Sequence, residues 1–203
     1  MKIIIHIALA LTVLLCTNCW DDNKTVTYHG IINENNASKI VIIEPTDFKE
    51  FYDLLERIEA VTCNDSIPTI SIKENDEEKL LGLANPCRQG VACILIKRQN
   101  VLKIKDEKIK MLDLISLDSL ESYVTKHYTN NGASYSFSRS PHDALVSIIY
   151  ESKDMSNLKS ILNKITNSYS ALNLEAPLKI WFDQEIPPPP PPLEGLTKSS
   201  NLL

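Results

Sequence analysis

Five cysteines are the residues of this chain best suited to covalent chemistry: Cys16, Cys19, Cys63, Cys87 and Cys93. The last three lie in the body of the chain, where an oxidising compartment would pair two of them and leave one thiol over. A Cys87–Cys93 bond would close a short loop, whereas a bond from Cys63 to either would fasten the end of an expected helix to the middle of the chain. The sequence leaves the pairing open. No obvious base lies near these thiols in the sequence, so a catalytic cysteine is the least favoured interpretation.

The histidines and acidic residues show no spacing that is typical of an active site or a metal site. His29, His127 and His142 lie far apart. The pair His142-Asp143 could orient an imidazole for acid–base catalysis, as in a small secreted or periplasmic enzyme, but such a pair is more often part of a turn. The sequence has no phosphate loop or serine nucleophile motif, and its acidic runs lack the pattern of a calcium loop. We therefore expect no catalytic residue, no metal and no cofactor.

Length and charge limit the kinds of partner that the chain can have. With 203 residues, of which 43% are hydrophobic, it can form one or two small globular domains. Its formal net charge is −5, and its lysines are interleaved with acidic residues along the sequence. Nucleic acid and an anionic membrane surface both require a basic stripe. We therefore expect neither as the main partner, and no nucleic-acid binding.

The N-terminus predicts export from the cytoplasm. Met1-Lys2 precedes an apolar run over residues 3–15, which is the layout of a signal peptide and is too short to span a bilayer. We place the signal at residues 1–18. A cysteine at the end of such a run resembles the lipobox of bacterial lipoproteins, which predicts lipidation of Cys19, with Cys16 as the alternative. Ordinary signal cleavage would instead give a soluble secreted protein.

Residues 19–90 are expected to form a tether followed by a small β/α unit. Strands are predicted over 25–32, 39–43 and 69–72, and a helix between the last two is expected to begin at Thr46 as N-cap. Its buried face has helical spacing and comprises Phe51, Leu54, Leu55, Ile58 and Val61. Residues 74–83 read as a turn or a short helix. The loop over 85–90 separates this unit from the next.

Residues 91–183 repeat the same pattern of strands and helices. Strands are predicted over 92–96, 101–105, 144–150 and 178–182, with 109–111 extending or pairing with the second. A helix capped by Ser116 or Asp118 is expected to end near Gly132, and another runs over 158–172. The almost wholly apolar strand 144–150 suits the middle of a sheet. Residues 134–138 read as an edge strand or a loop. The tail, 184–203, contains six consecutive prolines and predicts an exposed polyproline rod, as a spacer or a docking peptide.

The fold class is therefore α/β (α+β), with two small sheet-plus-helix units. The second unit resembles the periplasmic domain of the ExbD/TolR family, particularly the ExbD-like chains of Bacteroidetes. The likeness lies in element order, ββαβαβ, and in these segments: 94–96, 100–104, 117–128, 144–148, 155–172 and 176–180. The apolar N-terminal segment lacks the acidic residue of the transmembrane helix of that family, so proton-driven work is not expected.

The resemblance implies a non-enzymatic protein that acts by contact with other proteins. It implies protein partners in the cell envelope, in a TonB–ExbB–ExbD type of transport system, and a homodimer. With the lipid anchor, it indicates a periplasmic or outer-membrane lipoprotein of a Gram-negative bacterium. A binding module of unrelated origin, such as an immunity or adhesion protein, is the other non-enzymatic interpretation.

Overall fold

The computed structural model describes residues 25–33, 35–74, 77–88, 96–151 and 154–184. Several sequence predictions fall outside these ranges. They are the signal over residues 1–18, lipidation at Cys16 or Cys19, the third body cysteine Cys93, the strand over 92–96 apart from Ile96, and the polyproline segment. These stay predictions.

The first unit is built on a four-stranded sheet, here called sheet A, with strand order β1-β4-β3-β2. The strands are β1 (Thr25–Gly30), β2 (Ile40–Ile42), β3 (Ile67–Glu74) and β4 (Glu77–Gly82). β3 and β4 are antiparallel, whereas β1 pairs with β4, and β2 with β3, in parallel. Short 3₁₀ turns precede β2 (η1, Ala37–Lys39) and follow it (η2, Pro45–Asp47).

Strand β4 was not predicted from the sequence, which indicated a turn or a short helix over 74–83. The prediction was wrong because the strand is stabilised by contacts that are distant in sequence. β4 lies between β3 and β1, and Lys79 and Leu81 are buried on one of its faces. A strand is normally recognised by alternating apolar and polar residues. In β4 one of the buried positions is a lysine within an acidic run, so this alternation is not visible in the sequence.

Helix α2 (Phe51–Thr62) begins later than the sequence indicated. Thr46 is not its N-cap, because Pro45 instead starts the 3₁₀ turn η2 and the chain is extended at Phe48 and at Glu50. The predicted buried face is otherwise confirmed: Phe51, Leu54, Ile58 and Val61 are buried, and Leu55 is half-buried. This face packs on β3 and on the second unit.

The second unit is built on a five-stranded sheet, sheet B, with strand order β7-β6-β5-β8-β9. The strands are β5 (Val101–Lys105), β6 (Lys108–Lys110), β7 (Leu114–Ser116), β8 (Leu145–Ile149) and β9 (Ile180–Phe182), and the 3₁₀ turn η3 (Arg98–Asn100) precedes β5. β8 is buried along its whole length and lies inside the sheet, as its apolar sequence predicted. β7 was not predicted, because three residues carry too little alternation to be recognised.

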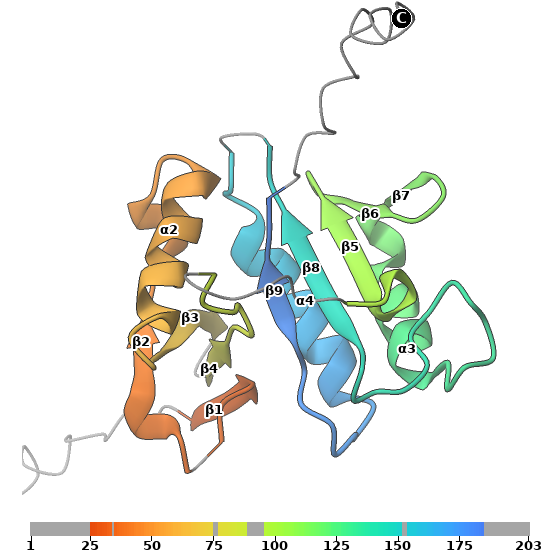
Figure 1. The fold of residues 1–203 in the computed structure, drawn as a ribbon, viewed down its shortest axis with the longest axis horizontal. Coiled ribbons are helices and arrows are strands. Elements are labelled where there is room, and N and C mark those ends of the chain that lie inside the picture. Colours follow the sequence, from red (N-terminus) through yellow and green to blue (C-terminus); the bar gives the residue numbers. More distant parts are fainter. Residues whose placement is uncertain (1–24, 34, 75–76, 89–95, 152–153, 185–203) are drawn as a thin grey trace, which may run out of the picture.

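Helices α3 (Leu120–Thr129) and α4 (Leu158–Ser170) both lie on one face of sheet B, behind it in the view of Figure 1. The predicted helix cap at Ser116 or Asp118 is wrong for α3, whose N-cap is Ser119. The Ser116 hydroxyl instead accepts the backbone N–H of Asp118 and caps the 3₁₀ turn η4 (Leu117–Ser119), which leads into the helix. The helix ends before Gly132, because its C-cap is Asn130, and the left-handed conformation that follows is shared by Asn131 (φ +45°) and Gly132 (φ +82°). Residues 134–138 form a loop and no strand. Leu158 and Ile165 of α4 are fully buried.

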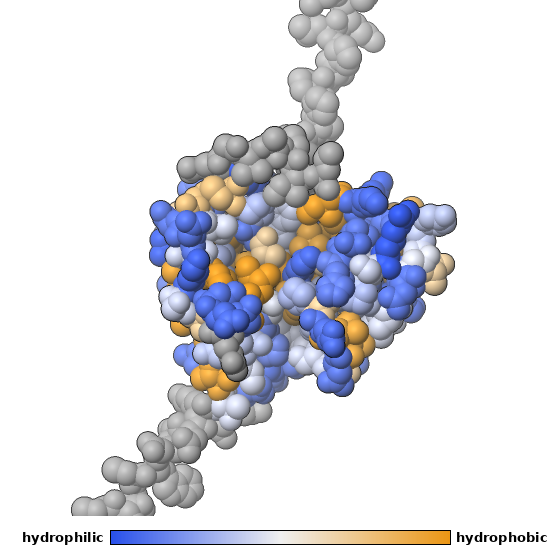
Figure 2. Space-filling model, turned by 60° about the horizontal axis from the view of Figure 1, so that its bottom comes forward, coloured by the Kyte–Doolittle hydropathy of each residue, from blue (hydrophilic) through white to orange (hydrophobic). Residues whose placement is uncertain are grey.

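The two units share one hydrophobic core. The Phe51 ring of α2 lies 5.5 Å from the Tyr150 ring and 5.8 Å from the Phe182 ring, both in the second unit. Buried residues of both sheets and of α2, α3 and α4 form one contiguous cluster. Figure 2 shows apolar side chains gathered in the middle of the molecule, with hydrophilic ones on either side. The described chain is thus a mixed α/β structure of two sheets with three helices packed into a common core.

Candidate functional site

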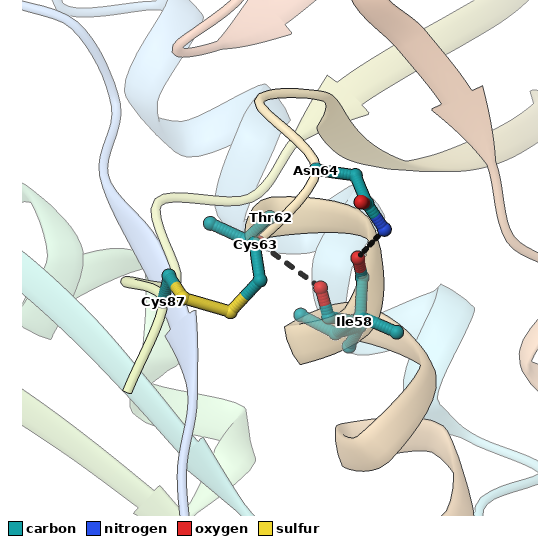
Figure 3. Close-up of a disulfide and its surroundings, with 6 residues drawn as sticks. Ile58, Thr62, Cys63, Asn64 and Cys87 are labelled. Carbon is teal, nitrogen blue, oxygen red and sulfur yellow. Dashed lines mark hydrogen bonds between the residues drawn. A yellow bond between two sulfur atoms is a disulfide. The ribbon is translucent and has the colours of Figure 1, made fainter. Parts of the chain in front are cut away.

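A disulfide fastens the end of α2 to the segment that leads from the first unit to the second. Cys63, at the C-terminal end of α2, is bonded to Cys87, with a Cα–Cα distance of 4.8 Å (Figure 3). Of the pairings that the sequence left open, this is one of those that fasten the helix end to the middle of the chain. A Cys87–Cys93 bond, the short-loop alternative, is therefore wrong.

The segment that carries Cys87, residues 83–88, is here called the strap. It runs along the outer edge of β9, where the N–H of Ala84 donates to the carbonyl oxygen of Ile180 at 2.8 Å. The Asn85 side chain binds both backbone groups of Phe182, donating to its carbonyl at 2.6 Å and accepting from its N–H at 3.0 Å. Arg88 pairs with Asp183 at 2.8 Å. The sequence predicted only a loop here. The Asn85 side chain binds β9 in the place of a neighbouring strand, and a single side chain of this kind leaves no periodic pattern in the sequence.

His142 and Asp143, the candidates for acid–base catalysis, do not form a site. Both side chains are exposed, and within the described residues no hydrogen bond joins them. The Asp143 N–H donates to the carbonyl of Ser140 at 3.2 Å, and the Lys179 ammonium donates to the carbonyl of His142. The pair is part of a turn before β8, which is the alternative that the sequence favoured.

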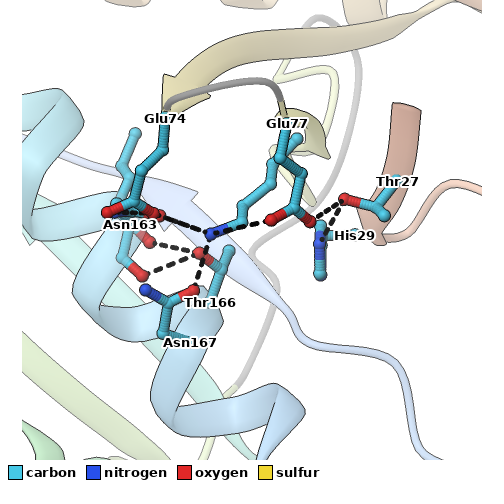
Figure 4. Close-up of polar contacts among 9 residues, drawn as sticks. Thr27, His29, Glu74, Glu77, Asn163, Thr166 and Asn167 are labelled. Atoms are coloured by element: carbon cyan, nitrogen blue, oxygen red, sulfur yellow. Dashed lines mark hydrogen bonds and ion pairs between the residues drawn. The ribbon is translucent and has the colours of Figure 1, made fainter. Parts of the chain in front are cut away.

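The main polar site that the structure brings together lies between β4 and α4 and is called the interunit cluster (Figure 4). Its centre is Lys79, whose side chain is only 6% exposed. The ammonium donates to Asn167 at 2.7 Å, to Asn163 at 2.9 Å and to Glu74 at 3.1 Å. Three acceptors use all three ammonium protons, which makes burial of this charge tolerable. The sequence could not reveal this site, because Asn163 and Asn167 lie more than eighty residues from Lys79.

The one positive charge of the interunit cluster lies between two carboxylates. Glu77 lies 3.9 Å from Lys79, on the side opposite to Glu74. The Asn163 amide donates to the Glu74 carboxylate at 2.8 Å, and this bond, together with Lys79, lowers the pKa of Glu74. A second ion pair joins the units nearby, between Glu44 after β2 and Lys159 of α4. The cluster thus fixes α4 to sheet A through groups that are paired with one another.

Thr27 and His29 of β1 complete the interunit cluster on its outer side. The Thr27 hydroxyl lies 3.1 Å from His29 Nε2 and donates to Glu77 at 3.1 Å. In a nucleophile–histidine–acid relay the imidazole lies between hydroxyl and carboxylate. Here the hydroxyl lies between the other two groups, so the arrangement is not that relay. Burial, and next the charge of Lys79, lower the pKa of His29.

An open hollow between the start of α3 and the end of α4 adjoins the interunit cluster at Asn167. It has a volume of about 450 Å³ and is lined by Leu117, Asp118, Leu120, Glu121, Lys164, Asn167, Ser168 and Ala171. The lining combines two acidic side chains, one lysine and small or aliphatic groups. This mixture does not select one ligand charge, and we assign it no ligand.

His127 of α3 is buried and holds the loop that leads to β8. Its Nδ1 accepts the N–H of Ser138 at 3.4 Å, so the ring proton lies on Nε2 and is donated to the carbonyl of Asn100 at 3.2 Å. Ser138 also donates from its hydroxyl to the carbonyl of Ser140 at 2.9 Å. Burial lowers the pKa of His127 to about 4, so the imidazole is neutral at physiological pH.

This histidine is expected to make the protein less stable in mild acid. The unfolded chain binds the proton near pH 6.5 and the folded chain only near pH 4, so stability is lost as the pH falls through that window. The loss between pH 7 and pH 5 is about 2 kcal/mol. Urea unfolding at both pH values measures it. His127→Gln, which keeps a donor towards Asn100, is expected to flatten the dependence, whereas His142→Asn at the exposed turn leaves it unchanged. If the free energy of unfolding depended equally on pH in both variants, His127 would not be the source of the pH dependence.

Comparisons with known proteins add no name to this geometry. No family model matches the chain, no curated protein matches it, and no solved structure matches it. Among the described residues, no helix has the length and apolar character needed to cross a bilayer, and no group of three His, Cys, Asp or Glu side chains is placed to hold a metal ion.

Proposed function

We propose that this chain is a lipid-anchored protein of the cell envelope that acts by binding other proteins, in a transport system of the TonB–ExbB–ExbD type. In this proposal Cys19 carries the lipid, Cys16 being the alternative, and the second unit makes the contact. The proposal names no catalytic residue and no cofactor.

The observation that carries the binding role is the open edge of sheet B. Among the described residues, β7 is the last strand on its side. Leu112, in the hairpin before it, is fully exposed, and Leu114, its first residue, is 59% exposed. A free strand edge beside exposed leucines is suited to pairing with another chain. The opposite edge, at β9, is already paired with the strap.

The element order of the second unit supports the likeness to the ExbD/TolR periplasmic domain. Of the predicted order ββαβαβ, the described residues contain β5, α3, β8, α4 and β9 in that sequence, with the short strands β6 and β7 added between β5 and α3. The predicted first strand, over 92–96, lies outside the described residues apart from Ile96. Both helices lie on the same face of the sheet, as the apolar pattern of the segments that carry the resemblance suggests.

A crosslinking experiment tests the binding role. The whole protein, with a photoreactive residue at position 113 beside the leucines, is expected to crosslink to an ExbB- or TonB-type protein in envelopes. Leu112→Ser/Leu114→Ser is expected to abolish that crosslink. Ile42→Ser/Tyr52→Ser removes two exposed apolar groups from the first unit and is the matched control, with the crosslink retained. A crosslink that survives the leucine changes, or no crosslink to such a protein, would discard the proposal.

The anchor is tested separately. Mass spectrometry of the mature N-terminus is expected to find acyl chains on Cys19, and Cys19→Ser is expected to move the protein from the membrane fraction to the soluble fraction. An unmodified N-terminus would leave the binding role standing without the anchor.

A further inference from the structure

The face of sheet B that points away from α3 and α4 carries a set of four lysines, here called the lysine face. On β5, Lys103 and Lys105 alternate with the buried Leu102 and Ile104. On β6, Lys108 and Lys110 flank the buried Ile109 in the same way. Since neighbouring side chains of a strand point to opposite faces, all four lysines share the face opposite to that of Leu102, Ile104 and Ile109.

The strand register brings these lysines together in pairs. Lys103 lies directly opposite Lys110, and Lys105 lies directly opposite Lys108. Like charges directly opposite each other on adjacent strands are destabilising. Lys105 is paired with Glu151 at 2.8 Å. Within the described part of the chain, Lys103 and Lys108 take part in no ion pair.

The two acidic residues that separate the lysines in sequence each bind a group that lies outside β5 and β6. Asp106 and Glu107 form the two-residue turn between β5 and β6, and both have positive φ, as such a hairpin turn requires. The Asp106 carboxylate accepts the N–H of Glu151 at 2.8 Å, and the Glu107 carboxylate accepts from the Asn157 amide at 3.0 Å. Lysines and acidic residues therefore alternate in the sequence, while the strand register places four lysines on one face of the folded sheet.

We infer that the lysine face binds a carboxylate-rich, extended segment of a partner protein. Alternate residues of a strand lie about 6.6 Å apart, so the lysines of β5, and those of β6, match the spacing of alternate acidic residues in an extended peptide. Such a partner would also relieve the repulsion between the facing lysines. The structure favours a peptide over an anionic membrane, because the match lies in the spacing along the strands and the chain as a whole carries net charge −5.

This inference rests on the proposed binding role and names the chemistry of the partner. It does not depend on the lipid anchor or on the resemblance to the ExbD/TolR family. Its test is therefore separate from the crosslinking at the β7 edge. The probe is a fluorescent peptide of alternating glutamate and threonine, and the reference peptide has glutamine in place of glutamate. Binding to the whole protein is measured by fluorescence anisotropy at low salt.

The acidic peptide is expected to bind and the glutamine peptide not to bind. Lys103→Gln/Lys108→Gln is expected to weaken binding about tenfold. Lys39→Gln/Lys49→Gln removes two exposed lysines from the first unit and is expected to leave binding within about twofold. The Lys103/Lys108 variant removes a repulsion, so its melting temperature is expected to be no lower than that of the parent, which separates lost binding from lost folding.

Two results would overturn the inference. One is equal weakening by both double variants, which would mean that only net charge matters. The other is binding to vesicles of phosphatidylglycerol and phosphatidylcholine that depends on Lys103 and Lys108 while the acidic peptide does not bind, which would assign the lysine face to a membrane surface.

Discussion

Phe51→Ala is expected to lower the free energy of unfolding by about 4 kcal/mol, the largest effect of any change considered for this protein. The Phe51 side chain is 4% exposed and packs against Tyr150 and Phe182 of the other unit. Its removal leaves a cavity where α2 meets the second unit. Urea denaturation followed by circular dichroism measures the loss.

The neighbouring Tyr52 provides a matched control. It lies on the same helix with its side chain 56% exposed, so Tyr52→Ala is expected to change stability by less than about 0.5 kcal/mol. Because the units share one core, the parent protein is expected to unfold in a single transition. Two separate transitions in the parent would contradict the shared core, and equal effects of the two substitutions would contradict the burial of Phe51.

Removing the disulfide is expected to cost about 3.5 kcal/mol, from the chain entropy that a loop of this length releases in the unfolded state. Cys63 and Cys87 are separated by 24 residues. The bond also holds the strap, so its loss is expected to expose the amides of β9 to hydrogen exchange. The double variant Cys63→Ser/Cys87→Ser and the parent are compared in urea with and without a reductant.

The reductant serves as the control in this comparison. It is expected to destabilise the parent to the level of the double variant and to have no effect on the double variant itself. A parent whose stability is insensitive to complete reduction would show that the Cys63–Cys87 bond does not stabilise the fold.

The parts of the fold that the sequence predicted are those whose signal is local and periodic. α4 repeats its apolar residues at helical spacing, and β8 is a continuous apolar run, so both were found. β4 was missed because its strand character depends on partner strands at both sides and on a buried lysine, two of whose three acceptors come from α4. The start of α2 was misplaced because Pro45 and Thr46 are as suited to a 3₁₀ turn as to a helix start.

The candidate sites were even less accessible from the sequence than the fold. The interunit cluster joins residues from β1, β3, β4 and α4, and none of them belongs to a recognisable motif. The lysine face was hidden because Asp106 and Glu107 interrupt the lysines in the sequence and are turned away in the fold. In both cases strand register and side-chain direction decide the outcome, and neither can be read without knowing which strands are neighbours.

The strap has a consequence for assembly. Ala84 and Asn85 occupy the backbone groups along β9, so sheet B can be extended only beyond β7. A sheet with one blocked side cannot propagate, because each added molecule would need two open sides to continue a fibre. Edge-to-edge pairing through sheet B therefore stops at a dimer. Reduction of the Cys63–Cys87 bond would loosen the strap that covers β9 and so make polymerisation easier.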